Sequence, residues 1–210
     1  HIVPVSIEGR VHDLNDNTAR RDATVDKLAR LRPVFDRERG VITPGNASRF
    51  SDGAGAVLIG SRAWAHRHGL TELAVIRDYQ LTGVDSLHEE MLLGPAMSIP
   101  RLLGRNRLSF DDIDVWEIHE AFATQVLINR QCMASAAFVR ERLGDGLPSG
   151  DIPLERLNAW GGSLSLGNPF AATGVRLLLT AAQRLQASGE RYAVVATCAG
   201  GGLGAALLLE

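Results

Sequence analysis

The sequence predicts an α/β fold. Short apolar stretches that favour strands alternate with helical patterns along most of its 210 residues, and this alternation is typical of α/β layering. The composition, 45% hydrophobic and 22% charged, is that of an ordinary globular protein long enough to bury a core. We therefore expect a compact folded protein.

The first 72 residues are predicted to contain two strands and two helices. The apolar runs "IVPVSI" (2–7) and "GAVLIGS" (55–61) are typical of strands. "DATVDKLARLRPVF" (22–35) has a polar cap followed by apolar residues at helical spacing, and "SRAWAHRHGL" (61–70) predicts a helix that ends at Gly69. A long polar loop joins the two halves of this region.

The α/β alternation continues through the middle of the chain. Strands are predicted at 72–81 and 111–119, with a helix at 92–108 between them. Residues 120–143 predict one long helix or a helix with a break, and 144–157, rich in Gly, Pro and Asp, predict a surface loop.

The last 50 residues predict one helix and a β-hairpin. The hairpin consists of two apolar strands around a glycine turn in "RYAVVATCAGGGLGAALLLE" (191–210). The helix is amphipathic. Its predicted apolar face comprises Val175, Leu178, Leu179, Ala182 and Leu185.

Charge and hydropathy exclude several classes of function. The net charge of −2, with no basic cluster, argues against a nucleic-acid partner. No apolar run approaches the roughly 20 residues of a membrane-spanning helix, and no stretch resembles a signal peptide, so a cytoplasmic location is expected. Because the sequence begins with His1 inside an apolar run, we expect the chain to be part of a longer protein.

The two cysteines, Cys132 and Cys198, are expected to be free thiols. Cys198 follows the apolar "YAVVAT" and precedes four small residues, where backbone N–H groups could lower the pKa of a thiol and hold an oxyanion. The alternative is a tight hairpin turn with Cys198 as a small buried residue. Cys132 is expected to be structural.

Two further polar residues stand at the ends of predicted elements. His119 lies between a strand and a helix, and the helix N-terminus would keep its imidazole neutral and able to bind a water or a carbonyl; a histidine satisfied by backbone is the alternative. Asn168 can donate through its amide but cannot act as a base, and its alternative is a turn or cap residue. The other five histidines form no metal-ligand cluster, so no metal is expected.

Four ordered motifs together resemble the thiolase family. They are "TPGNASRFSDGAGAVL", "HEAFATQ", "GGSLSLGNPFAATGVR" and "CAGGGLGAALLLE". The histidine in "HEAF" is similar to that of the beta subunits of fatty-acid beta-oxidation trifunctional complexes. The resemblance implies an acyltransferase that cleaves 3-ketoacyl-CoA with coenzyme A, or runs the reverse condensation, with coenzyme A as substrate and no cofactor.

The resemblance also implies roles for individual residues. Cys198 matches the family's second cysteine, which moves the α-proton of acetyl-CoA, and the N–H of Gly200 matches an oxyanion donor. His119 matches the position that holds a catalytic water in the other oxyanion hole. The coenzyme A loop is matched by Pro44, Gly45 and Ser48.

Two features depart from the family's pattern. The nucleophilic cysteine belongs to an N-terminal half of which almost all is missing here, and neither cysteine of this chain occupies its motif. Asn168 stands where the family has a histidine that activates the nucleophile, so the donor is kept and the base is lost. Asn168 is then an inactivating change, or His119 compensates for it, or the protein has drifted from thiolysis.

By the same resemblance the fold is a layered αβαβα thiolase fold, present as its C-terminal half. Residues 1–48 would end a loop domain with the coenzyme A loop, 49–72 would finish the N-terminal domain, and 73–210 would form the C-terminal domain. Such a half exposes a sheet edge and an apolar helix layer. The expected partners are the missing half, further copies in a homodimer or tetramer, and a hydratase/dehydrogenase alpha subunit.

Three hypotheses therefore compete. The first is a thiolase-class acyltransferase. The second is a coenzyme A-binding module without catalysis, and the third is a subunit that completes an assembly. Thioester turnover separates the first from the others, and saturable coenzyme A binding separates the second from the third.

Overall fold

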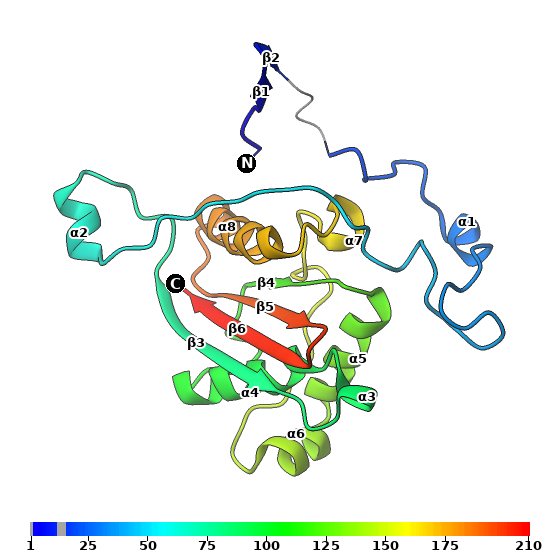
Figure 1. The fold of residues 1–210 in the computed structure, drawn as a ribbon. Helices are drawn as coiled ribbons and strands as arrows, with labels where there is room; N and C mark the ends of the chain where they lie inside the picture. The colour runs from blue at the N-terminus through cyan, green and yellow to red at the C-terminus, as the bar shows by residue number, and fades with distance from the viewer. Residues whose placement is uncertain (1, 12–15) are drawn as a thin grey trace.

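A four-stranded sheet forms the centre of the computed structural model, which describes residues 2–11 and 16–210 and confirms the α/β fold (Figure 1). Its strand order is β3-β6-β5-β4. β6 pairs antiparallel with both of its neighbours, whereas β4 pairs parallel with β5. The strands span Ile76–Gly83 (β3), Val115–Ile118 (β4), Ala193–Ala199 (β5) and Leu203–Leu209 (β6).

Helices cover both faces of this sheet (Figure 1). On one face α8, Ala171–Ser188, packs against β4 and β5. On the other face α4, Gly94–Asn106, packs against β3, β5 and β6, with α5 (Ala123–Ala134) and α6 (Ala136–Leu143) beside it. The shorter elements are β1 (Ser6–Ile7), β2 (Arg10–Val11), α1 (Val25–Ala29), α2 (Arg62–Arg67), α3 (Leu87–Glu90) and α7 (Ser163–Leu166).

The core has two parts because alternate residues of a strand point to opposite faces. On β5, Val194 and Ala196 join a cluster with residues of α4, whereas Ala193 and Val195 join a second cluster with Leu177 and other residues of α8. Each fully buried aliphatic side chain of this kind contributes roughly 1.5–3 kcal/mol. The strands are apolar throughout because both faces of the sheet are covered.

The predictions for the middle and end of the chain are largely confirmed. The predicted hairpin is β5 and β6, and the predicted long helix has its break at Ser135, whose Oγ accepts a hydrogen bond from the N–H of Phe138 and begins α6. Residues 144–157 contain no helix or strand, as predicted, but Ile152 within them is fully buried. This loop is therefore anchored in the core.

The predictions for the first 60 residues are largely wrong. The predicted strand at 55–61 is an extended segment without a partner strand, the helix at 22–35 is reduced to α1, and the strand at 2–7 is reduced to a two-residue pairing with β2. Strands need hydrogen-bonded neighbours and helices need an apolar surface to pack on. In the described part of the chain the segment 55–61 has no partner strand, and Leu58 within it is 72% exposed.

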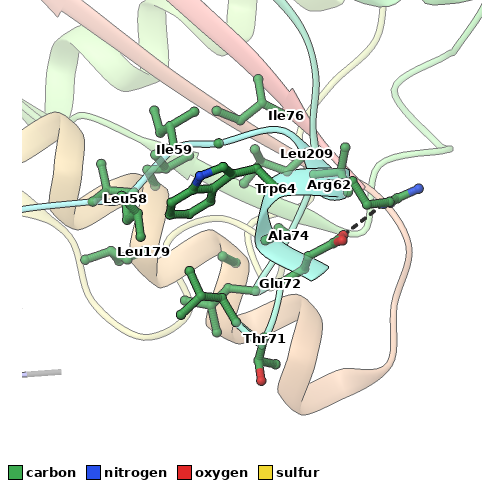
Figure 2. A pocket seen from close by; sticks show the side chains of 18 of the residues that line it. Leu58, Ile59, Arg62, Trp64, Thr71, Glu72, Ala74, Ile76, Leu179 and Leu209 are labelled. Carbon is green, nitrogen blue, oxygen red and sulfur yellow. Dashed lines mark hydrogen bonds and ion pairs between the residues drawn. The ribbon is translucent and has the colours of Figure 1, made fainter. Parts of the chain in front are cut away.

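The predicted apolar face of α8 is confirmed in part, since Leu185 is buried against the sheet and Leu178 packs beside it. Leu177, Ala181 and Leu185 face the sheet. Leu179, which was assigned to that face, instead lines a separate cavity of about 520 Å³ beneath the extended segment, together with Leu58, Ile59 and Trp64 (Figure 2). The helix is thus apolar on two sides, because it is covered by the sheet and by the preceding part of the chain.

No helix in the described residues has the length and apolar character required to cross a membrane. The longest, α8, has 18 residues and carries two arginines.

Gly94 and Gly204 allow α4 to pack directly on β6. A Cβ atom added to Gly204 would lie 2.4 Å from the Cα of Gly94, closer than packed atoms can approach. We predict that Gly204→Ala lowers the free energy of unfolding by about 1–3 kcal/mol, because the helix must move away from the strand. Urea denaturation measures this effect. Gly201→Ala is the matched control, because its Cβ would meet nothing within 4 Å, and equal midpoints for the two variants would contradict the prediction.

Candidate active site

A cavity of about 1190 Å³ lies at the carboxyl ends of β4 and β5. Loops that follow parallel strands commonly gather functional groups at this edge of a sheet. The predicted site residues that line the cavity come from four separate motifs. They are Ser48, His119, Asn168, Cys198 and Gly200.

His119 directly follows β4 and extends its pairing with β5. Its backbone N–H donates to the carbonyl of Ala196 over 2.8 Å, and its Nδ1 lies 2.9 Å from the Oγ of Ser163. Burial, together with the positive charge of Arg176, lowers the pKa of His119 to about 4. The neutral imidazole expected from the sequence is thus supported, but for a different reason, since α5 begins only at Ala123.

Asn158 and Glu120 fix the backbone around His119. The Asn158 side chain accepts from the N–H of Ile118 over 2.8 Å and donates to its carbonyl over 2.9 Å. Its amide also donates to Glu120 over 2.6 Å, and Glu120 accepts from the N–H of Leu164 over 3.0 Å. The loop after residue 157 is therefore tied to the end of β4.

Asn168 is held in a single orientation by its neighbours. Its Oδ1 accepts from the hydroxyl of Thr173 over 2.8 Å and from the N–H of Phe170 over 3.2 Å. Its Nδ2 donates towards Ser48 Oγ at 3.4 Å. The amide nitrogen is therefore the end of Asn168 directed to Ser48 and the cavity, and it is a donor without basic character.

Cys198 lies at the end of β5 and is buried. Burial raises the pKa of its thiol to about 11, against the smaller effect of a backbone hydrogen bond. The hypothesis that the glycine turn lowers this pKa is therefore wrong, because desolvation of the thiolate outweighs the backbone dipoles. The N–H of Gly200 has no acceptor among the described residues and remains available to a ligand.

The other residues named from the sequence lie elsewhere. Pro44 and Gly45 do not line the cavity, and a Cβ on Gly45 would meet Leu28 and Leu31, so its small size suits the packing of α1. Their contact with coenzyme A stays a prediction. Cys132 is partly buried and packs against the core cluster that contains residues of α4. Among residues 2–11 and 16–210 no group of three or more His, Cys, Asp or Glu side chains could hold a metal ion.

Two residues beside His119 were missed by the sequence reasoning. Ser163 contacts the imidazole, and Arg176 of α8 donates to the same Ser163 Oγ over 2.9 Å. The one signal in the sequence was for Arg176, a charged residue next to the apolar run "LLL" of α8. Ser163 gave no signal, because serine is common in glycine-rich loops.

The cavity can bind an apolar chain that carries a polar carbonyl. Its wall is mostly apolar and includes Phe35, Phe122 and Ile128, while Gly200 and Asn168 contribute donors. Donors in a water-poor site stabilise negative charge that develops on a carbonyl oxygen. A thiol beside them can give up a proton, and its thiolate can take one.

Comparison with protein families gives two matches that together cover most of the chain. The model described as "Thiolase, C-terminal domain" matches residues 70–210. The model described as "Thiolase, N-terminal domain" matches residues 1–63.

Individual relatives agree with this assignment. The chain is 42% identical over 210 residues to the "Probable 3-ketoacyl-CoA thiolase" of Caenorhabditis elegans, covering 100% of this chain and 47% of the relative. It is 42% identical over 209 residues to the "Trifunctional enzyme subunit beta, mitochondrial" of Bos taurus, covering 100% of this chain and 44% of the relative. This chain therefore spans about half the length of the curated relatives it matches.

A solved structure shows the same fold. The dimeric peroxisomal thiolase of Saccharomyces cerevisiae superposes with a TM-score of 0.82 at 34% identity, covering 99% of this chain and 47% of that one. The layered thiolase fold predicted from the four motifs is thus confirmed. Together with the family match over residues 70–210, this similarity shows that the chain belongs to the thiolase family.

Proposed function

We propose that this chain forms the part of a thiolase active site that handles proton transfer and carbonyl polarisation in the thiolytic cleavage of 3-ketoacyl-CoA, or in the reverse condensation. One observation carries the proposal: Ser48, His119, Asn168, Cys198 and Gly200, from four distant motifs, line a single cavity. Similarity to the C. elegans protein named as a 3-ketoacyl-CoA thiolase supports the choice of substrate.

In this proposal Cys198 is the acid of the cleavage direction. Thiolysis releases the enolate of acetyl-CoA, and the enolate carbon needs a proton. Because burial raises the pKa of Cys198 to about 11, the thiol keeps its proton at neutral pH and can supply it. In the condensation direction the same sulfur removes the α-proton, and it does so as the thiolate.

The donors of the cavity stabilise the enolate and thioester oxygens. The free N–H of Gly200 and the amide of Asn168 donate directly, and a neutral His119 donates to a carbonyl oxygen or to a water that bridges to one. Ser48, with the predicted loop residues Pro44 and Gly45, would lie along the pantetheine arm of coenzyme A. No cofactor or metal is required by this chemistry.

The partners of the protein are part of the same proposal. The yeast relative is described as dimeric and the bovine one as a subunit of a trifunctional enzyme, which supports a homodimer or tetramer and a hydratase/dehydrogenase alpha subunit as partners. The thiolase half that carries the nucleophilic cysteine is the remaining partner. The bovine relative is named as mitochondrial, so its name does not support the cytoplasmic location expected from the sequence.

The alternative is a coenzyme A-binding or assembly subunit with impaired catalysis. Asn168 favours it, because its Oδ1 is already occupied by Thr173 and Phe170 and the side chain has no basic group. Such a protein would keep the cavity and bind acyl-CoA without turnover.

The decisive experiment is a 3-ketoacyl-CoA thiolysis assay on protein whose intact mass has been measured. A mass near twice the 22.6 kDa of this chain with turnover supports the thiolase. A mass of 22.6 kDa without turnover, but with saturable coenzyme A binding by calorimetry, supports the binding module. If the protein shows neither turnover nor coenzyme A binding, the assembly subunit is the remaining hypothesis.

We predict that Asn168→His raises kcat for thiolysis by about 10²-fold, because an imidazole at this position adds a base to the existing donor. Steady-state kinetics of wild type and variant measure the ratio. Asn168→Ala is the control, because it removes the donor without adding a base and should lower kcat. If Asn168→His is no faster than wild type, the loss of the base is not what limits this protein.

We predict that Cys198 reacts slowly with iodoacetamide at pH 7 and about tenfold faster for each pH unit up to pH 10. A thiol whose pKa is raised to about 11 gains thiolate throughout this range. Mass spectrometry of a Cys132→Ser variant follows Cys198 alone, with circular dichroism as the check on folding. A rate that levels off below pH 9 would show that the thiol pKa is not raised.

A further inference from the structure

A short hydrogen-bonded chain stands behind His119. Arg176 Nη2 donates to the Oγ of Ser163 over 2.9 Å, and the same Oγ lies 2.9 Å from His119 Nδ1. Ser163 is fully buried and His119 is 7% exposed. The three side chains come from α8, from the first residue of α7 and from the end of β4.

The direction of each hydrogen bond follows from the chemistry of the groups. A guanidinium has donors and no acceptor, so Ser163 Oγ must accept from Arg176. The hydroxyl keeps one hydrogen, and His119 Nδ1 is its only other partner in the described part of the chain. Donation from Ser163 to Nδ1 satisfies all three groups.

The opposite arrangement is unfavourable. If His119 Nδ1 carried the proton, Ser163 Oγ would accept twice and its own hydrogen would be buried without an acceptor, at a cost of about 1–3 kcal/mol. The imidazolium form has the same defect and adds repulsion from Arg176. Nδ1 is therefore the acceptor of the ring, and the proton is on Nε2.

Nε2 is the nitrogen that a substrate can reach. It has no hydrogen-bond partner among residues 2–11 and 16–210, and it is not among the side-chain atoms shielded from solvent without a partner. His119 lines the cavity beside Asn168 and Cys198. An Nε2–H group there is a donor of one hydrogen bond.

We propose that Ser163 and Arg176 are positioning residues that fix His119 as its neutral Nε2–H tautomer, so that the ring donates to a thioester carbonyl oxygen or to the water bound to it. This inference rests on the proposed function for its ligand, but not for the tautomer itself. Ser163 and Arg176 act only through His119 and do not contact the substrate.

The surroundings of Arg176 keep its charge in place. Burial lowers the pKa of the guanidinium, but the charges of Glu117, Glu120 and Asp16 act in the opposite direction and favour the cation. Its Nε and Nη1 find no acceptor among the described residues, so the hydrogen bond to Ser163 is the direct polar contact that orients it there. Because Arg176 and His119 share Ser163 Oγ as a hydrogen-bond partner, the charge of Arg176 makes a second positive charge on His119 costly.

The test is nitrogen NMR of histidine-labelled protein, because the two tautomers give different ¹⁵N shifts. His119 is assigned by the loss of its signal in His119→Gln, among the six histidines of the chain. We expect the Nε2–H pattern in wild type between pH 6 and 8. In Ser163→Ala we expect a mixture of tautomers, about a 10-fold lower kcat and a KM within about 2-fold of wild type. An Nδ1–H pattern in wild type, or an unchanged pattern in Ser163→Ala, overturns the proposal.

Three variants separate positioning from a general structural effect. Ser165→Ala is the matched control, because Ser165 lies on the same short helix and bonds to the Gly162 carbonyl and not to His119; it should leave both tautomer and kcat unchanged. Arg176→Met should give mixed tautomers even though Ser163 is intact, and Arg176→Lys should restore the wild-type pattern. Equal tautomer patterns for Arg176→Met and Arg176→Lys would also overturn the proposal.

The tautomer readout does not depend on turnover, so the two proposals fail separately. The expected NMR pattern in a protein that does not cleave 3-ketoacyl-CoA would reject the proposed function and keep the positioning network. Turnover together with the Nδ1–H tautomer would support the proposed function and reject the positioning network. The wild-type spectrum decides the tautomer even if a variant does not fold.

Discussion

The parallel pairing of β4 with β5 is the constraint on which the site depends. Ile118 pairs with Ala196 in this register, and the N–H of His119 then donates to the Ala196 carbonyl. Two residues further along β5 stands Cys198. A shift of one residue would turn His119 to the other face of the sheet, away from Ser163 and from Arg176 of α8.

A buried ion pair links this strand pairing to the helix that covers it. Arg184 of α8 donates to Glu117 over 2.7 Å and to the carbonyls of Trp116 and Arg156 over 3.2 and 3.0 Å. Burial raises the pKa of Glu117, and Arg184 opposes this effect. Buried pairs of this kind add little net stability, but losing one partner is costly. The pair thus specifies where β4, α8 and the loop before Asn158 meet.

The sequence predicted the elements after residue 72 well because each carries its own pattern and finds its partner within the chain. The hairpin of β5 and β6 and the break at Ser135 are examples. The strand predicted at 55–61 does not form in the described residues. A strand needs hydrogen-bonded neighbours, and no neighbour pairs with this segment. Leu179 was assigned to the wrong side of α8 for a related reason, since the helix is covered on two sides.

The site was predicted through resemblance, whereas its supporting contacts were not. Four motifs indicated Ser48, His119, Asn168, Cys198 and Gly200, and all five line one cavity. Ser163 is 44 positions from His119 and 13 from Arg176, and a contact over such separations depends on how the loops pack. The raised pKa of Cys198 was missed for the same reason, because the glycine-rich turn indicates dipoles while burial is set by the whole fold.

Opposite pKa shifts support the roles proposed for His119 and Cys198. The environment lowers the pKa of the imidazole to about 4 and raises that of the thiol to about 11, so that neither changes its charge near neutral pH. The imidazole is then a neutral donor and the thiol is an acid, and divergent pKa values of two neighbouring groups commonly mark such a division of roles. Asn168 adds a donor and no base. The three residues therefore combine two hydrogen-bond donors with one acid.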